Sequence, residues 1–307
     1  MNIPSDVQDL VRQIFLNCNQ RVSSKLSRIP NIHETSLDHS FIEHFTHHCR
    51  PVETPSQWTV RLDCHFIGGG RHWDRWEVAD FGILVVFRHK GKVLRTKAVL
   101  LQSKRLFPRE APDIETNPLD VDLGFNFLFV RDERWADLVA PRDFTFDNAS
   151  LYRSLQVGDE QYEAIKKHER RFKIPIHYLL YNPLTIPSTT SFPIIMPETH
   201  GIINCEIGCR VVPAPILREM VEKRSVERPP SYSEVATQLQ SPFAAGNTAG
   251  GWCLESYIVD WLMACKDGMI DETPQYQHLS HIFSQKSAPI HAAVLITFDM
   301  PSASALE

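Results

Sequence analysis

The sequence lacks the features of a membrane protein or of a disulfide-stabilised secreted protein. None of its apolar runs approaches the length of a membrane span, and its first residues do not have the pattern of a signal peptide. Its seven cysteines are scattered and odd in number, which favours a reducing cytoplasm over a disulfide framework. With 43% hydrophobic and 22% charged residues in 307, we expect a soluble, cytoplasmic, globular protein with no membrane partner.

An overall excess of positive charge is also missing, because the net charge is −5. The net charge alone therefore does not indicate a nucleic-acid-binding protein. The distribution is more informative, since eight lysines and arginines and no acidic residue occur from Arg88 to Arg109. This strip can hold phosphates, or it can be a solvated hairpin whose lysines protect the strands. Within it, we predict that Arg105, Arg95 and Lys97 contact nucleic acid.

Two short apolar runs predict an antiparallel hairpin with polar residues at one end. Residues 83–87 follow Asp80, residues 98–101 precede Gln102 and Lys104, and a polar turn containing a glycine separates the runs. In such a hairpin the start of the first strand lies beside the end of the second. We therefore expect Asp80 to lie close to Gln102 and Lys104.

The chemistry of this predicted cluster suits a phosphate-cleaving metal site. Asp80 and Gln102 offer a carboxylate and an amide oxygen, and hard cations such as Mg²⁺ bind oxygen ligands. Lys104 offers an ammonium group that can stabilise negative charge on a phosphate or orient a water. Because side chains alternate along a strand, Gln102 and Lys104 should point to one face and Ser103 to the other.

The pattern of Asp80 followed by Gln102-Ser103-Lys104 resembles the catalytic hairpin of the PD-(D/E)xK nuclease superfamily. It is most similar to the variant with Gln-x-Lys in place of Glu-x-Lys, as in Mrr-type restriction endonucleases, and by pattern it covers about residues 33–183. The resemblance implies a restriction-endonuclease-like α/β (α+β) fold with a mixed central sheet flanked by helices. It further implies an endonuclease that uses Mg²⁺ or Mn²⁺, cuts DNA in preference to RNA, and acts in bacterial anti-phage defence or restriction.

Nucleases of this superfamily carry a glutamate, directed at the metal, on the helix before the sheet. Here a helix is predicted at about residues 36–49, and Glu34 and Glu43 are the candidates. A helix extended back to Glu34 would place it on the apolar, packed side, whereas Glu43 falls off that side. We therefore assign Glu34 as a fourth catalytic residue and third metal ligand. Glu43 stays open as an alternative, as does Glu77, three residues before Asp80.

Periodicity predicts the elements on either side of the hairpin. An amphipathic helix spans residues 5–28, with Ser5 as its N-cap and its apolar stripe facing the core. A strand at residues 58–67 precedes the hairpin, and a charged helix at residues 159–172 and a buried strand at residues 174–181 follow it. The order helix, three strands, helix, strand is also the core order of the resembled superfamily.

These elements divide the chain into three parts. The parts are an N-terminal amphipathic helix (1–30), a nuclease-like core (31–183) with an insertion (106–150), and a C-terminal region (184–307) that is accessory or completes the sheet. The insertion should contain one strand, near its apolar run at residues 125–130. In the C-terminal region the pattern predicts a short helix at 215–224, a linker at 229–251, a helix at 252–266 and a strand at 289–298.

Two other classes of function also fit the sequence. The neutral Gln102 and the negative net charge favour a non-cleaving nucleic-acid-binding or scaffold subunit of a defence complex, built on a nuclease-like core. The apolar N-terminal helix and the helix predicted at 252–266 can instead serve as docking surfaces in a homo-oligomer or a larger complex. Substitution of the predicted catalytic residues separates a nuclease from both alternatives.

Overall fold

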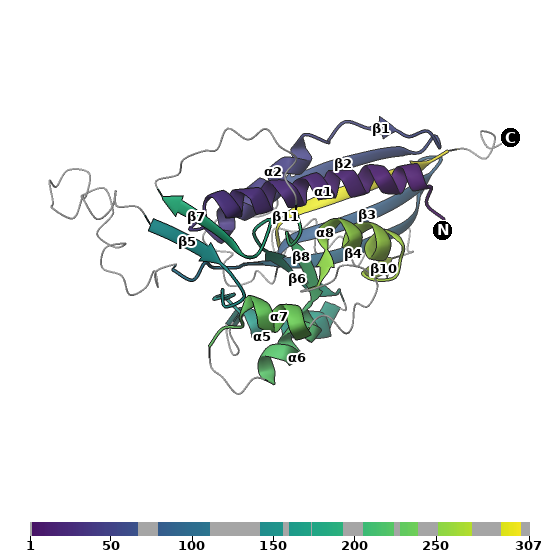
Figure 1. Cartoon of the computed structure of the whole chain (residues 1–307). Coiled ribbons are helices and arrows are strands. Elements are labelled where there is room, and N and C mark those ends of the chain that lie inside the picture. The colour runs from purple at the N-terminus through teal and green to yellow at the C-terminus, as the bar shows by residue number, and fades with distance from the viewer. Residues whose placement is uncertain are drawn as a thin grey trace, which may run out of the picture.

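In the computed structural model, helices flank a central mixed β-sheet (Figure 1). The residues that it describes are 2–66, 79–110, 142–155, 160–172, 174–192, 205–223, 228–238, 251–271 and 290–301. This architecture confirms the predicted class, a mixed α/β protein with a central mixed sheet flanked by helices. None of the helices described has both the length and the apolar character that a membrane crossing requires.

The predicted helices and strands of the core region are present with small shifts in their ends. The helices are α1 (Ser5–Arg28), α2 (Glu34–Thr46), α5 (Glu160–Phe172), α6 (Ala214–Glu222), α7 (Tyr232–Gln238) and α8 (Leu254–Ser256), followed by the π-helix η2 (Tyr257–Met263). The strands are β1 (Val52–Glu53), β2 (Thr59–Phe66), β3 (Ala79–His89), β4 (Lys92–Arg105), β5 (Arg142–Phe146), β6 (Ile176–Tyr181), β7 (Ser188–Phe192), β8 (Arg210–Pro213), β9 (Trp252–Cys253), β10 (Met269–Asp271) and β11 (Ile290–Met300).

The last strand of the chain occupies a central place in the main sheet. Among the described residues this sheet has nine strands in the order β1-β2-β11-β3-β4-β6-β8-β9, with β10 paired to β4. β11 lies between β2, to which it is antiparallel, and β3, to which it is parallel. Strands from the region after residue 184 are therefore hydrogen-bonded into the same sheet as the hairpin.

β3 and β4 form the hairpin that the sequence predicts. Phe81 pairs with Leu101, and the turn consists of Lys90 and Gly91, with φ angles of 50° and 74°. Two-residue hairpin turns favour this positive-φ conformation because its twist matches that of the strands. Most side chains of β3 are buried on both faces of the sheet, as expected for a strand covered by helices on both sides.

Helices α1 and α2 pack against one another and against the sheet (Figure 1). The predicted apolar stripe of α1 is confirmed: Val7, Val11, Phe15, Cys18 and Val22 are fully buried. The prediction that Ser5 caps α1 is wrong, because Pro4 holds the N-cap position and Ser5 is already helical. On α2, the ring of Phe41 stacks on Phe81 of β3 with 4.9 Å between centroids, which holds α2 against the strands of the hairpin.

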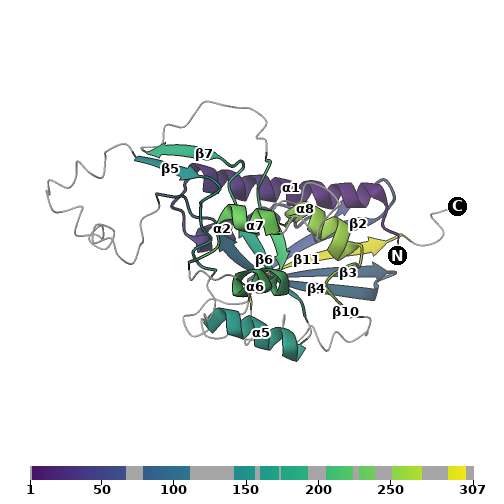
Figure 2. The same ribbon diagram turned by 60° about the horizontal axis from the view of Figure 1, so that its bottom comes forward.

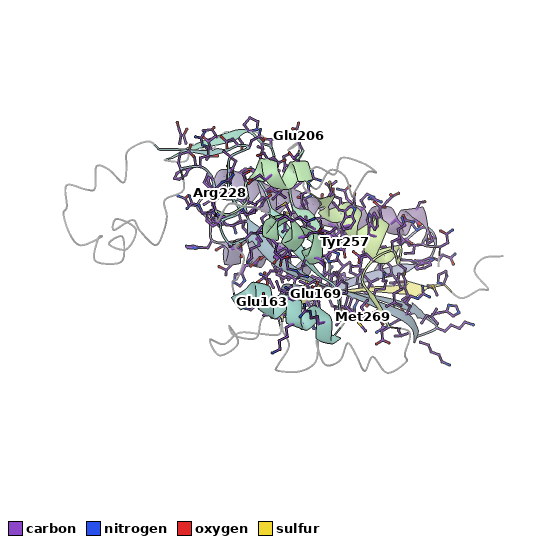
Figure 3. All side chains as sticks on the ribbon, turned by 90° about the horizontal axis from the view of Figure 1, so that it is seen from below. Glu163, Glu169, Glu206, Arg228, Tyr257 and Met269 are labelled. Atoms are coloured by element: carbon purple, nitrogen blue, oxygen red, sulfur yellow. The ribbon has the colours of Figure 1, made fainter. Side chains whose placement is uncertain are left out.

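The opposite face of the sheet is covered by α5 (Figure 2). This helix connects β4 to β6, which run parallel, and parallel neighbours require a crossover of this kind. Arg218 of α6 donates a hydrogen bond of 2.5 Å to Glu169 of α5, and both side chains are largely buried. Figure 3 labels Glu169 on α5.

The C-terminal region differs from the sequence prediction in two places. The prediction of a helix at 252–266 is wrong for its first two residues, which form β9. Trp252 pairs with Val211 of β8, and the helical segment, α8 followed by η2, begins only at Leu254. The linker predicted at 229–251 contains α7. In the insertion, β5 pairs with β7 in a separate two-stranded sheet, and the apolar run at 125–130 lies outside the described residues.

Candidate active site

The candidate site lies where β3 begins and where β4 and β6, the next two strands of the sheet, end. Antiparallel pairing of Phe81 with Leu101 brings the preceding residue, Asp80, opposite Gln102. The Gln102 amide nitrogen donates a hydrogen bond of 2.5 Å to Asp80 Oδ2. The two residues that the sequence predicts at the mouth of the hairpin therefore touch.

The oxygen of Asp80 that meets Gln102 accepts two further hydrogen bonds. The main-chain N–H of Ser103 donates at 2.6 Å and its hydroxyl at 2.8 Å. Strand alternation predicts that Ser103 points away from Gln102, yet at the end of β4 both residues reach the same carboxylate. Three donors to one oxygen fix Asp80 firmly and help keep it ionised.

Lys104 and Glu34 form the second contact of the site. The Lys104 side chain is 7% exposed, and its ammonium nitrogen lies 3.3 Å from Glu34 Oε1. The other oxygen of Glu34 accepts a hydrogen bond of 2.9 Å from the main-chain N–H of Arg105. α2 begins at Glu34, so the helix does extend back to this residue and brings it to the end of β4.

Two residues that the sequence analysis did not single out also belong to the cluster. Asp38 lies one turn after Glu34 on α2, and Tyr181, at the end of β6, donates a hydrogen bond of 2.8 Å to its Oδ1. His291 of β11 lies 3.8 Å from Asp80 Oδ1, because β11 runs parallel to β3 and beside it. The four-residue spacing of Glu34 and Asp38 was a usable signal, whereas no local pattern points to His291.

Burial and mutual repulsion set the acidity of the three carboxyl groups. Burial raises the pKa of Glu34, and the charge of Asp80 adds to this while Lys104 opposes it. Burial also raises the pKa of Asp38 well above its usual value, with Asp80 and Glu34 contributing. For Asp80, burial acts in the same direction, but the facing His291 and the charge of Lys104 outweigh it and lower the pKa. A bound cation would favour the charged form of all three.

The donor set fits a magnesium-like ion in one respect and conflicts with it in another. Gln102 is 1% exposed, and among the described residues its buried Oε1 accepts no hydrogen bond, so this oxygen has acceptor capacity for a cation. However, Gln102 meets Asp80 through its nitrogen, so the two predicted ligand oxygens do not face each other until the amide makes a half-turn. Within the described part of the chain, no three His, Cys, Asp or Glu side chains form a group able to hold a metal.

The alternative metal ligands lie apart from this cluster or cannot be placed. Glu43 is 59% exposed and pairs with Arg21 on the surface at 2.7 Å. Glu77 lies outside the described residues. Glu34 is therefore the candidate glutamate that the fold brings to Asp80 and Lys104.

The residues predicted to contact nucleic acid are not displayed as a basic surface. Lys97 lies opposite Ile270 of β10, is fully buried and donates a hydrogen bond to the carbonyl of Asp267. Arg95 lies against Cys265, with 3.8 Å from Nη1 to Sγ. Arg105 is 3% exposed and donates a hydrogen bond of 2.9 Å to the carbonyl of Pro30. Burial lowers the pKa of Arg105 to about 10, although the charge of Glu34 opposes this.

The exposed basic turn of the hairpin is far from the candidate site. Lys90 and Lys92 are exposed, but ten residues of extended chain separate Lys90 from Asp80, about 33 Å at 3.3 Å per residue. The turn and the site cannot contact the same phosphate. Of the basic strip, Lys104 and Arg105 contact Glu34 at the site.

Comparison with known proteins does not narrow the choice of function. No protein-family model, no curated protein and no solved structure matches this chain.

Proposed function

We propose that the protein is a metal-dependent endonuclease that hydrolyses phosphodiester bonds, with DNA favoured over RNA as substrate. The observation that carries this proposal is the meeting of Asp80 and Gln102 at 2.5 Å, with Lys104 at the same strand end and Glu34 at 3.3 Å from it. Resemblance to Mrr-type nucleases suggests a role as an effector of bacterial defence or restriction, by analogy only.

Each residue of the cluster then has a role that follows from its chemistry. Asp80 and the free oxygen of Gln102 would hold Mg²⁺ or Mn²⁺. When bound, such an ion supplies positive charge at the scissile phosphate and acidifies a water molecule. Lys104 would stabilise the charge that develops on the phosphate oxygens. Glu34 orients the ammonium group of Lys104, which is nearly enclosed by protein.

A second candidate function is supported by the hydrogen bonds of Asp80. Its Oδ2 is already satisfied by Gln102 and Ser103, and the neutral Gln102 gives the site one negative charge fewer than an acidic residue would. A lower ligand charge weakens cation binding. These features favour a non-cleaving nucleic-acid-binding or scaffold subunit of a defence complex.

Incubation of the purified protein with supercoiled plasmid separates the two candidates. The nuclease should nick or linearise the plasmid in Mg²⁺ and leave it intact in EDTA. Asp80→Ala and Lys104→Ala should each abolish cleavage, whereas Lys223→Ala, which removes a lysine that is 74% exposed, should leave it unchanged. Full activity of either site variant would remove the assigned roles. A gel shift without metal-dependent nicking would support the second candidate.

A further inference from the structure

Ser103 supplies two of the three hydrogen bonds that Asp80 Oδ2 accepts. Its main-chain N–H donates at 2.6 Å and its hydroxyl at 2.8 Å, while the Gln102 amide donates the third bond at 2.5 Å. Ser103 is fully buried, so solvent does not compete for its two bonds. The other oxygen of Asp80, Oδ1, lies 3.8 Å from Nδ1 of the half-exposed His291. The hydrogen bonds on Oδ2 therefore hold the carboxylate and leave Oδ1 available to a ligand.

The bond from Gln102 is the one that the proposed reaction cannot keep. For the oxygen of this amide to take part in the site, the amide must make a half-turn, which carries its nitrogen away from Asp80. The turned amide offers an acceptor where it offered a donor, so it no longer restrains the carboxylate. The two bonds from Ser103 do not depend on the amide. They are therefore the bonds that hold Asp80 while Gln102 turns.

The hydroxyl is the part of this anchor that a change of residue can remove. Every residue except proline provides a main-chain N–H, whereas the second bond requires a side-chain donor at position 103. Alanine there would leave Asp80 with one of its two lasting bonds and with space to rotate where the hydroxyl was. The sequence pattern names only the residues on either side, Gln102 and Lys104, but the geometry also restricts the one between them.

We propose that Ser103 is the positioning residue of the site: its hydroxyl and N–H fix Asp80 in the orientation in which it acts, so position 103 requires serine or threonine. This inference rests on the proposed function, in which the carboxylate of Asp80 must stay at the mouth of the hairpin. It deepens that function by assigning a task to a residue that touches neither substrate nor ion.

Plasmid cleavage by the full-length protein in Mg²⁺ tests the assignment. Ser103→Ala should lower kcat about tenfold, as loss of a hydrogen bond to a metal-ligating carboxylate commonly does, and should leave KM for the plasmid nearly unchanged. Ser103→Thr keeps the hydroxyl and should recover most of the rate. Ser23→Ala is the matched control and should cleave like the parent, because Ser23 is also fully buried but its hydroxyl donates to Asn19 at 3.2 Å within α1.

Titration with Mn²⁺, followed by the electron paramagnetic resonance signal of the free ion, gives a measure that does not depend on cleavage. Ser103→Ala should bind Mn²⁺ about tenfold more weakly than the parent, whereas Ser103→Thr and Ser23→Ala should bind it like the parent. Because threonine adds a methyl group at a buried position, the melting temperature of each variant is measured first, and all assays are run where every variant is folded.

Three results would overturn the inference, and they differ in what they mean for the proposed function. If the parent cleaves and Ser103→Ala matches it in kcat and in Mn²⁺ binding, the role of Ser103 is wrong and the proposed function stands. A folded Ser103→Thr that is as impaired as Ser103→Ala has the same meaning, because the hydroxyl is then not the group that acts. If the parent neither cleaves nor binds Mn²⁺, both fall.

Discussion

Replacement of Lys104 by methionine tests how charge is balanced at the site. The Lys104 side chain is 7% exposed and lies 3.3 Å from Glu34. Its charge also acts on Asp80. Methionine retains an apolar stem of similar length but removes the ammonium group, so the carboxylates lose their nearest common counter-charge.

The expected loss of stability follows from this geometry. Two unit charges 3.3 Å apart attract by about 5 kcal/mol at an effective dielectric constant of about 20. The Glu34 side chain is 26% exposed, so solvent screening reduces this, and we expect the free energy of unfolding at pH 8 to fall by about 2 to 3 kcal/mol. For a chain of 307 residues the melting temperature should fall by about 3 to 5 °C.

The loss should depend on pH in a defined direction. Lys104 lowers the pKa of Glu34, so its removal raises that pKa in the folded state. The part of the destabilisation that comes from Glu34 is then fully present above the raised pKa and disappears as the pH falls below the pKa of Glu34 in the folded parent protein. The part that comes from Asp80 persists to lower pH, because the pKa of Asp80 in the folded parent is lowered. The difference in melting temperature between Lys104→Met and the parent protein should therefore be larger at pH 8 than at pH 4.

Thermal unfolding followed by circular dichroism at the two pH values measures this effect. Lys223→Met is the matched control, because Lys223 is 74% exposed and pairs with Glu219 on the surface of α6. It should melt like the parent at both pH values. A Lys104→Met variant with the parent's melting temperature at pH 8, or with an equal loss at both pH values, would contradict the charge balance inferred here.

Three further predictions follow from burial. Asp38→Asn should raise the melting temperature at pH 8 but not at pH 4. Burial raises the pKa of Asp38, so ionisation of this side chain as the pH rises destabilises the folded parent protein, and asparagine cannot ionise. Equal shifts at both pH values would argue against this. His44 should titrate by NMR with a midpoint of about 4, since burial lowers its pKa, and a midpoint near 6.5 would mean that the ring is solvated. Phe41→Ala should reduce the free energy of unfolding by about 3 to 5 kcal/mol in urea denaturation, whereas Phe66→Ala, at a residue that is 65% exposed, should have little effect.

The parts of the fold that the sequence predicts are those set by local rules. Two apolar runs and a positive-φ turn at Gly91 determine the hairpin, and antiparallel geometry then brings Asp80 to Gln102 without any further information. The family resemblance indicates a glutamate on the helix before the sheet, and helical spacing then selects Glu34 over Glu43; α2 does begin at Glu34. These features arise within segments of about 30 residues or fewer.

The parts that the sequence does not predict depend on contacts between distant segments. β11 enters the sheet between β2 and β3, so His291 comes to lie beside Asp80 from more than 200 residues away. The bond from Tyr181 to Asp38 spans 143 residues. Lys97 has the pattern of a surface cation, but β10 pairs beside it and its ammonium group, which is buried, donates to the carbonyl of Asp267. No periodicity or motif in one chain encodes which strands become neighbours.

The most direct test of the metal site is anomalous X-ray scattering from crystals of the protein soaked in Mn²⁺. We predict a manganese peak directly coordinated by oxygens of Asp80 and Gln102, with the Gln102 amide turned so that Oε1 faces the ion. A well-ordered cluster without manganese, or manganese bound only elsewhere on the protein, would contradict the account.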